Sequence, residues 1–286
     1  TLGNAEVSVV SDGPLPLGPA GDTIKGITKD EIDRALNANF LPTDNMVLEQ
    51  NCLVLNTGER LVLFDSGMGF SKAFGSTTGR LQQSLAEAKM FPDLIDDVIC
   101  THGHIDHIGG LADAKGKRLF PKATIHISKA DYDFWTDEKN LANKDLAMFI
   151  KHARDNLLPY KDRIKFVENG KDVVPGVQAM SAPGHTAGHT IFIIKSANKT
   201  LAFTGDITHH QILLTEKPRS EFAYDGEPKQ AVESLLKVFD MITTGRIPLL
   251  ACHCPWPGYG YLGRQGDGFR YYPQPMQIVK IPPKKS

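Results

Sequence analysis

The segment THGHIDHIGG, residues 101–110, places His102, His104, Asp106 and His107 close together in a chain that holds ten histidines. Imidazole nitrogens and carboxylate oxygens are ligands for divalent ions of the first transition row. A single tetrahedral ion rarely takes four ligands packed so tightly in sequence. Two-metal hydrolytic sites, with ions roughly 3.5–4 Å apart, share such ligands between the ions. The cluster therefore predicts a site for two metal ions.

A two-metal site needs further ligands from elsewhere in the chain. Three candidates stand where a predicted strand ends and a loop begins, namely His185 in SAPGHTAGH, Asp206 in LAFTGDI and His253 in LLACHCP. Functional side chains collect on loops that a rigid scaffold positions. Imidazole and carboxylate ligands suit zinc, manganese, iron or cobalt and do not choose sharply between them, and zinc is the ion we expect. The predicted ligand set is His102, His104, Asp106, His107, His185, Asp206 and His253.

Strand and helix patterns alternate along the chain and must position these residues. A capping box of Thr28 and Glu31 opens a predicted helix at 26–40. Pro- and Gly-rich stretches at 12–22 and 254–268 predict surface loops. The mixture predicts one domain, residues 1–286, of layered sheets and helices. Strands are expected at 46–67, with a turn at 56–59, and at 96–103, 123–128, 177–196, 199–207 and 247–254; further helices are expected at 76–90, 145–160 and 228–242.

The composition excludes several classes of protein. There are 32 Lys and Arg against 33 Asp and Glu, a formal net charge of −1, which is not the balance of a strongly basic nucleic-acid binder. No apolar run approaches the roughly 18 residues of a membrane helix. Four cysteines are too few for a disulfide framework in this chain. The sequence leaves the redox state of Cys52 and Cys100 open. We expect buried apolar thiols at Cys252 and Cys254, which alternation along a strand would direct away from His253.

The motifs THGHIDH, PGHTAGH, FTGD and CHC occur in that order, and LVLFDSG (61–67) precedes them. Together they resemble the metallo-β-lactamase superfamily. The resemblance implies an α+β fold, a four-layer αββα sandwich with metals at the sheet edges. It also implies a division of the ligands. His102, His104 and His185 would hold one metal, Asp106, His107 and His253 the other, and Asp206 would bridge the two.

The bridging carboxylate carries a further implication. True β-lactamases of the superfamily usually have cysteine or serine near the place of Asp206. The aspartate is similar to the lactonase, glyoxalase and phosphotriesterase branches. Antibiotic hydrolysis is therefore not the expected activity.

A narrower resemblance is to methyl parathion hydrolase and the related lactonases and arylesterases. It lies in AFGSTTGRL (73–81), ADYDFW (130–135) and GDGFRYYP (266–273). It implies a hydrolase of aryl esters and lactones that also cleaves organophosphate triesters such as methyl parathion. A histidine at position 209, where the organophosphate-degrading member is aliphatic, favours the lactone and aryl-ester activities. The implied substrate-binding residues are Phe74, Trp135, Met148, Phe149, His209 and Phe222.

The resemblance also implies roles, partners and a location. Two metals would supply an activated hydroxide at neutral pH, with Asp106 accepting its proton, Asp206 bridging, and His209 or a metal assisting the leaving oxygen. The partners would be a small-molecule substrate and a second copy in a homodimer, with no nucleic acid or membrane. A periplasmic or secreted enzyme is expected after leader removal, with a cytoplasmic one left open.

Other functions stay open at this point. A glyoxalase II-like thioesterase would be expected to have a basic glutathione-binding tail, whereas this sequence closes with only PPKKS. A mononuclear iron oxygenase shares the same fold. A nuclease is disfavoured because no basic stripe is present. A structural metal module is disfavoured because seven ligands exceed what one closed site needs.

Overall fold

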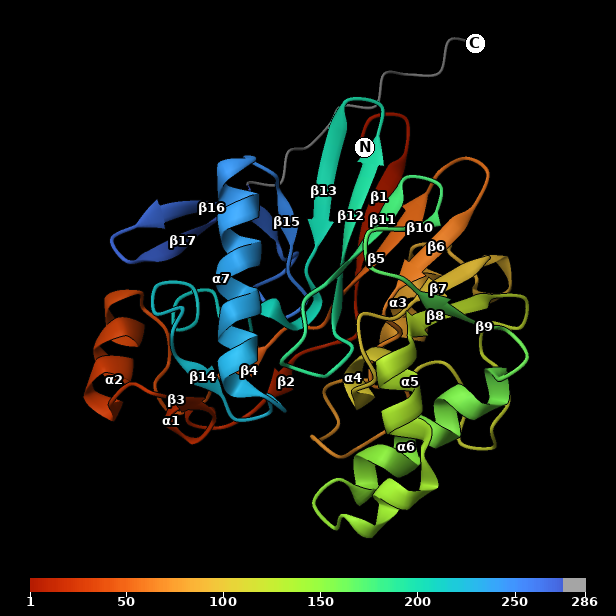
Figure 1. Ribbon diagram of the computed structural model, residues 1–286, viewed down its shortest axis with the longest axis horizontal. Helices are drawn as coiled ribbons and strands as arrows, with labels where there is room; N and C mark the ends of the chain where they lie inside the picture. The colour runs from red at the N-terminus through yellow and green to blue at the C-terminus, as the bar shows by residue number, and fades with distance from the viewer. Residues whose placement is uncertain (275–286) are drawn as a thin grey trace.

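Two β-sheets pack face to face in the computed structural model, which describes residues 1–274 (Figure 1). The first sheet has the order β1 (Glu6–Ser11), β5 (Asn51–Asn56), β6 (Leu61–Phe64), β7 (Asp97–Ile99), β8 (Thr124–Ser128) and β9 (Ile164–Val167). The second has the order β10 (Asp172–Val174), β11 (Val177–Ser181), β12 (Thr190–Ser196), β13 (Lys199–Phe203), β15 (Leu249–Leu250), β16 (Tyr259–Gln265) and β17 (Gly268–Pro273).

Alternation along the strands builds the layers. In β5, Leu53 and Leu55 face the second sheet, whereas Cys52 and Val54 belong to the core on the other side. Successive side chains of a strand point to opposite faces, so an all-apolar strand is buried on both. In β12, Phe192 faces the first sheet and shares that central core. This pattern confirms the predicted αββα sandwich.

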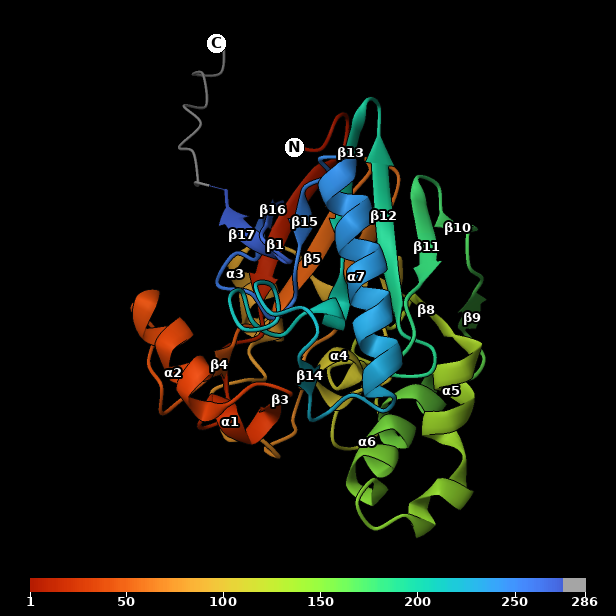
Figure 2. The same cartoon turned by 60° about the vertical axis from the view of Figure 1, so that its left-hand side comes forward.

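Helices cover both outer faces (Figure 2). α7 (Pro228–Thr244) lies along the second sheet, and α3 (Leu81–Glu87), α5 (Lys129–Thr136) and α6 (Ala147–Leu157) pack against the first. The remaining helices are α1 (Ala20–Thr23), α2 (Lys29–Ala38), α4 (Ile105–Ile108), η1 (Pro92–Leu94), η2 (Glu138–Ala142), η3 (Leu158–Tyr160) and η4 (Gly205–Ile207). Two further sheets have two strands each. One pairs β2 (Leu15–Pro16) with β4 (Val47–Leu48), and the other pairs β3 (Ile24–Lys25) with β14 (Glu221–Phe222).

Several predicted elements are confirmed and two are wrong. The capping box of Thr28 and Glu31 is present at the start of α2. The stretch 254–268 is not one surface loop, because residues 259–265 form β16, whose alternate residues are buried. The stretch 12–22 is not a surface loop either, because Leu15 is buried in a core cluster. The final predicted strand is shorter than expected and forms only Leu249–Leu250.

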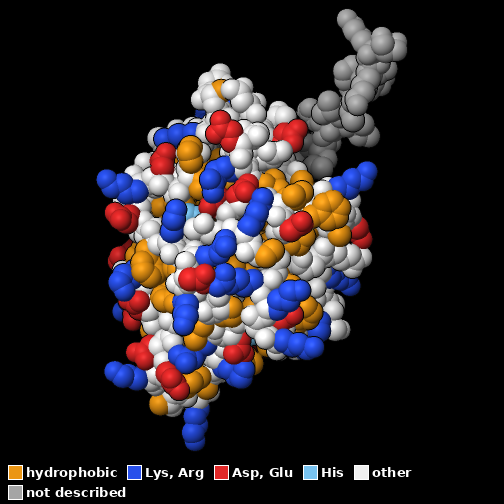
Figure 3. Space-filling model, turned by 90° about the vertical axis from the view of Figure 1, so that its right-hand side faces the viewer, with side chains coloured by type: hydrophobic (Ala, Val, Ile, Leu, Met, Phe, Trp, Pro, Cys, Tyr) orange, Lys and Arg blue, Asp and Glu red, His pale blue; other side chains and the backbone are white. Residues whose placement is uncertain are grey.

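The surface agrees with the near-neutral composition. On the face drawn in Figure 3, blue Lys and Arg side chains are interspersed with red Asp and Glu side chains. Within residues 1–274, no helix is both long and apolar enough to cross a bilayer. The closing PPKKS and the other residues of the predicted domain after 274 lie outside the described residues.

Candidate metal centre

The predicted ligands meet where loops leave the strands of both sheets. The segment after β7 carries four of them and continues into α4. His185 follows β11, Asp206 lies in η4 directly after β13, and His253 follows β15. Strand ends are rigid, so the loops that follow them hold side chains at defined positions. All seven predicted residues are brought together.

The first group consists of three imidazoles. Nε2 of His102 lies 3.0 Å from Nδ1 of His104, which in turn lies 2.9 Å from Nε2 of His185. These three nitrogen atoms are close enough together to surround one ion. The observed group is the one that the resemblance implied for the first metal.

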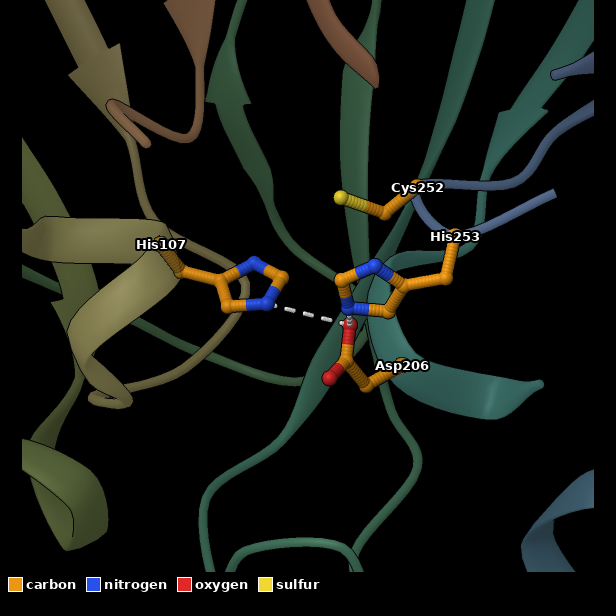
Figure 4. A group of neighbouring side chains, drawn as sticks. All are labelled: His107, Asp206, Cys252 and His253. Carbon is orange, nitrogen blue, oxygen red and sulfur yellow. Dashed lines mark ion pairs between the residues drawn. The ribbon is translucent and has the colours of Figure 1, made fainter. Parts of the chain in front are cut away.

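The second group lies around Oδ1 of Asp206 (Figure 4). Oδ1 of Asp206 lies 3.1 Å from Nε2 of His107 and 3.1 Å from Nε2 of His253. Oδ2 of Asp106 lies 3.4 Å from the same nitrogen of His107 and 3.6 Å from that of His253. The residues implied for the second metal are therefore also neighbours.

Asp206 stands between the two groups. While its Oδ1 faces His107 and His253, its Oδ2 lies 3.1 Å from Nε2 of His185 and 3.7 Å from Nε2 of His102. One oxygen of a single buried carboxylate is thus directed to each group of imidazoles. This is the position that a bridging ligand requires.

The donor atoms fit metal ions. Nε2 of His107 and Oδ1 of Asp206 are buried without a hydrogen-bond partner among the described residues. Buried polar atoms are normally satisfied, so such atoms need a partner the protein itself does not supply. Two divalent cations would satisfy the donors of both groups. Imidazole with carboxylate is a ligand set that suits zinc.

The far nitrogens of the histidines hold the rings in place. Nδ1 of His107 lies 2.8 Å from Oδ2 of Asp65, and Nδ1 of His185 lies 2.8 Å from Oδ1 of Asp225. Nδ1 of His253 lies 2.8 Å from the carbonyl of Glu49, to which it donates. A proton on each Nδ1 leaves the Nε2 lone pair free to face a metal.

The charges around Asp206 favour its ionised form. Burial raises the pKa of its carboxyl, but the surrounding imidazoles of His107, His253 and His209 outweigh burial and hold the pKa well below its usual range. Burial, assisted by nearby His107, holds the pKa of His102 well below its usual range. Burial lowers the pKa of His107 and of His253, but the charge of Asp206 outweighs burial and raises both. Carboxylate and neutral imidazole are the forms that bind metals, so these two imidazoles would release their protons when an ion binds.

His189 positions the backbone of Asp206. Its Nε2 accepts a hydrogen bond from the Asp206 N–H at 3.0 Å, and its Nδ1 donates to the carbonyl of Ala182 at 3.0 Å. The preceding Gly205 has φ +49°, and a Cβ there would lie 2.8 Å from that same Nε2. A left-handed conformation in so tight a place requires glycine.

Cys252 corrects one expectation. All four cysteines are buried and free. The predicted burial of Cys252 and Cys254 is confirmed, but Cys252 does not point away from the site. Its sulfur lies within 4.8 Å of ligand atoms of His107, Asp206 and His253 (Figure 4). The strand ends at Leu250, and the following residues form a turn, so strand alternation does not apply to them.

Asn51 holds that turn. Its side-chain nitrogen lies 3.0 Å from the carbonyl of Cys252 and 2.7 Å from that of Cys254. Asn51 begins β5 in the first sheet, whereas the turn follows β15 in the second. The contact ties the loop that carries His253 to the opposite sheet.

A cavity of about 580 Å³ opens above the metal centre. It is lined by Phe74, Trp135, Phe149 and Phe222 of the predicted pocket wall, and it reaches His104, Asp106 and Asp206. Met148 is a wrong prediction, because it lies outside the cavity and is 50 % exposed. Neighbours on a helix point in different directions, so Phe149 turns inward and Met148 outward. Leu15, Leu48 and Tyr224 also line the cavity.

His209 lies at the junction of the cavity and the metal centre. Its Nε2 is 2.9 Å from Oδ2 of Asp206, and its ring stacks on Phe222 with centroids 3.8 Å apart. Its Nε2 also belongs to a possible ligand group with His185 and Asp206. The residue is held against the bridging carboxylate and faces the cavity, as a substrate-contacting residue must.

Sequence reasoning missed the residues that orient the ligands. Asp65 was within reach, because LVLFDSG had been singled out as a motif. Asp225, Asn51 and His189 carry no comparable signal, since their partners are distant in sequence. Asp131 is another residue of this kind.

A comparison with protein families now identifies the chain. A family model described as "Metallo-beta-lactamase superfamily" matches residues 46–243. This range includes all of the predicted metal ligands except His253. The chain belongs to the metallo-β-lactamase superfamily. The shared fold agrees with the two packed sheets and their outer helices.

Known relatives add names to the superfamily match. An N-acyl homoserine lactonase of Bacillus sp is 25 % identical over 181 residues, which are 57 % of this chain and 64 % of the relative. That match spans somewhat less than two thirds of the relative's length. Another N-acyl homoserine lactonase, from Bacillus thuringiensis, is 22 % identical over 73 % of this chain and 82 % of the relative.

A solved structure matches over nearly the whole chain. AidC, described as a dizinc quorum-quenching lactonase in complex with a product, is 29 % identical, covers 97 % of both chains and has a TM-score of 0.91. Each of these proteins is one that this superfamily member resembles.

Proposed function

We propose that this protein opens lactone rings with the help of two zinc ions, and that its substrates are N-acyl homoserine lactones. The observation that carries the proposal is Asp206, which directs one oxygen to each imidazole group at the base of an apolar cavity. The names of the relatives support the substrate class. The dizinc description of AidC supports the metal.

The metal ions, when bound, supply a water of lowered pKa and a positive charge beside the carbonyl oxygen. His102, His104 and His185 would hold one ion, and Asp106, His107 and His253 the other, with Asp206 between. Gln50 donates to Oδ2 of Asp106 at 2.9 Å and so orients that carboxylate toward the centre. Asp106 would accept the proton of the attacking water.

His209 is placed where it could assist the leaving oxygen of a lactone. Its ring lines the cavity while Nε2 contacts Asp206. A lactone leaves as an alkoxide, which is a poor leaving group without a proton donor or a cation beside it. His209, or an adjacent metal, would assist that oxygen.

The cavity fits an acyl chain. Its volume of about 580 Å³ falls within the range of small-molecule pockets. Leu15 and Leu48 form one part of its wall, and Phe74, Phe149 and Tyr224 form another, with the Phe74 ring 6.5 Å from that of Phe149. A hydrocarbon chain buried there would gain about 0.8 kcal/mol for each CH₂ group. Affinity for lactones should therefore grow with chain length until the cavity is full.

The test is turnover of a series of N-acyl homoserine lactones by zinc-loaded protein. We expect ring opening, measured as acid release, with kcat/KM rising with acyl length, and we expect a chelator to abolish it. Absence of turnover on every member of the series by fully zinc-loaded protein would contradict the proposal.

Aryl esters and phosphotriesters are a second substrate class. The aromatic wall favours it, because Phe74, Tyr224 and Phe222 form neighbouring ring pairs suited to a flat aryl group. Phenolates also leave with little help from an acid. We propose that dihydrocoumarin is hydrolysed well and that a nitrophenyl dialkyl phosphotriester is a minor substrate.

The paired assay compares kcat/KM for these two compounds, each with and without chelator. A much larger value for dihydrocoumarin is expected. A larger value for the phosphotriester would instead make the protein an organophosphate hydrolase, and it would remove the role given to His209 in the preference.

A further inference from the structure

Asp131 is a buried carboxylate that no metal group includes. It lies in the first turn of α5, where Ser128 caps the helix, and is 1 % exposed. Its Oδ2 accepts hydrogen bonds from the Gly103 N–H and the Thr186 hydroxyl, both at 2.8 Å. Its Oδ1 accepts one from the Gly188 N–H at 2.7 Å. Hydrogen bonds to a charged acceptor are among the stronger ones in proteins.

These partners come from two separate loops. Gly103 lies between His102 and His104, and Thr186 directly follows His185. One carboxylate therefore accepts hydrogen bonds from both loops that supply the first group of imidazoles. The loops come from different sheets, since one follows β7 and the other follows β11.

We propose that Asp131 is a positioning residue that sets the geometry of one metal site, by fastening the loop of His102 and His104 to the loop of His185. The proposal rests on the two-metal centre of the proposed function. It assigns Asp131 no contact with substrate or metal. Its effect reaches the metal through the three imidazoles.

The packing around the carboxylate leaves little room for alternatives. A Cβ on Gly188 would lie 1.9 Å from Oγ of Ser128 and 2.7 Å from Oδ1 of Asp131. A Cβ on Gly103 would lie 2.3 Å from the Trp135 ring, one helical turn further along α5. Both loops are thus seated directly on the helix, and Asp131 is the polar contact that they share.

The second group of ligands is held by other means. His107 is oriented by Asp65, and His253 by the carbonyl of Glu49. Neither contact involves Asp131. Loss of Asp131 should therefore weaken one metal site and leave the other close to its original affinity.

The test replaces Asp131 with asparagine, which keeps the shape but turns one acceptor into a donor facing a donor. The matched control is Asp133→Asn on the same helix, whose exposed carboxylate pairs with Lys129. Zinc affinity is measured by competition with a chromogenic chelator. We expect two equivalents in the original protein and in the control. In Asp131→Asn, one equivalent should bind as before and the other about 10- to 100-fold more weakly.

Thermal unfolding with and without zinc separates positioning from mere structural support. A structural role would lower the melting temperature of the zinc-free and zinc-loaded forms alike. A positioning role reduces the rise in melting temperature that zinc produces. If Asp131→Asn does not fold, Thr186→Val removes one of the three bonds and should show a smaller loss at the same site.

Two results would overturn the proposal, namely unchanged affinity for both equivalents or equal weakening of both. Lactone turnover by the original protein is measured separately. If two zinc ions bind and Asp131→Asn loses one selectively while no lactone is opened, the positioning role stands and the proposed function fails.

Discussion

Asp206 determines whether the centre works as one unit or as two separate sites. Its two oxygens face different imidazole groups, and the Asp206 N–H is held by His189. A neutral or shorter side chain at this position would leave two clusters of nitrogen lone pairs facing each other across an empty space. Asp206 is therefore the one ligand that both ions would share.

We predict that Asp206→Ala and His104→Ala lose bound metal and activity together. Zinc content should fall below two equivalents, and kcat/KM on the best lactone should fall by more than about a hundredfold, because loss of supporting residues alone costs 10- to 100-fold. Metal analysis and kinetics on the same preparation measure both. His152→Ala serves as the control, since His152 belongs to none of the metal groups. Full activity in both site variants would contradict the two-metal assignment.

The seven proposed ligands could be predicted from sequence because four of them cluster within residues 102–107 and the other three each stand where a predicted strand ends. Asp131 and Asp225 could not, because single acidic residues in a helix or loop are ordinary. The prediction that Met148 lines the pocket failed because of its place on a helix. The sequence places aromatic and apolar residues near a pocket, but which of two neighbouring helix residues faces inward depends on the rotation of α6.

The loops that carry the ligands are packed tightly against the helices. Gly184, just before His185, has φ +129°, and a Cβ there would lie 2.1 Å from the backbone nitrogen of Ala231 in α7. That backbone cannot give way without moving the first turn of the helix. The position of His185 thus depends on where α7 lies.

We predict that Gly184→Ala destabilises the protein by roughly 2–5 kcal/mol, since a left-handed backbone costs about 1–2 kcal/mol and overpacking about 1–3. Gly170→Ala is the control, because Gly170 also has a positive φ, +78°, but nothing within 4 Å of the added Cβ. Urea unfolding of both variants measures the difference. Equal losses in the two variants would show that the contact with α7 does not constrain the loop.

Strand β7 begins with the buried carboxylate of Asp97, which neighbouring side chains hold in its charged form. Oδ2 of Asp97 accepts a hydrogen bond from Nε of Arg60 at 2.7 Å, and its Oδ1 lies 2.8 Å from Nε2 of His126. His126 is thus a buried strand histidine with a hydrogen-bonding partner. Burial raises the pKa of Asp97, but His126 and Arg60 outweigh burial and lower it below the ordinary value of 3.8. A depressed pKa contributes stability above that value, which is lost as the pH falls through the folded pKa.

We therefore predict that Asp97→Asn lowers the free energy of unfolding by about 1–3 kcal/mol near neutral pH. The gap between variant and original should narrow as the pH falls below about 4. Urea unfolding across that range measures it, with the exposed Asp172→Asn of β10 as the control. A gap that stays constant down to the lowest pH would contradict a charge-based contribution.

Elements with a clear period were predictable, and irregular ones were not. The capping box and the apolar strands could be recognised from local pattern alone. The hairpin of β16 and β17 was obscured by Gly and Pro, since Gly260 and Gly263 sit inside β16 where glycine usually signals a loop. A Cβ at Gly260 would lie 2.4 Å from the carbonyl of Tyr272, so close approach of the partner strand explains that glycine.

At the scale of the molecule, the metal centre joins the two sheets. Each group takes ligands from the segment after β7 in the first sheet and from loops of the second. Asn51 adds a contact of the same kind. Bound metal should therefore stabilise the packing of one sheet on the other.

We predict that removing zinc with a chelator lowers the melting temperature by roughly 10 °C. Free zinc at about a thousand times its dissociation constant stabilises the folded protein by mass action, and the chelator removes that stabilisation. Hydrogen exchange should quicken at 101–107, 184–189 and 251–254, while the central strands stay protected. Calorimetry and exchange measure the two effects. An unchanged melting temperature would mean that the sheets do not rely on the metals.

The αββα architecture could be predicted for the whole molecule, because its motifs follow one another in a characteristic order. Homodimer formation and export after leader removal stay predictions of the resemblance, since they depend on surfaces and segments that the ligand motifs do not describe. The same holds for the narrower likeness to methyl parathion hydrolase. Substrate preference depends on side chains whose combined shape appears only after folding.

The cavity and the metal centre are built from different parts of the chain. Leu15, Leu48, Phe74, Phe149 and Tyr224 line the cavity from segments that contribute no ligand. Substitutions at these five positions can alter which molecules enter the cavity, while the metal ligands stay in place. Such a division lets new substrate ranges evolve by small steps, each passing through a working enzyme. In the laboratory, these five positions are where a library for altered selectivity should begin.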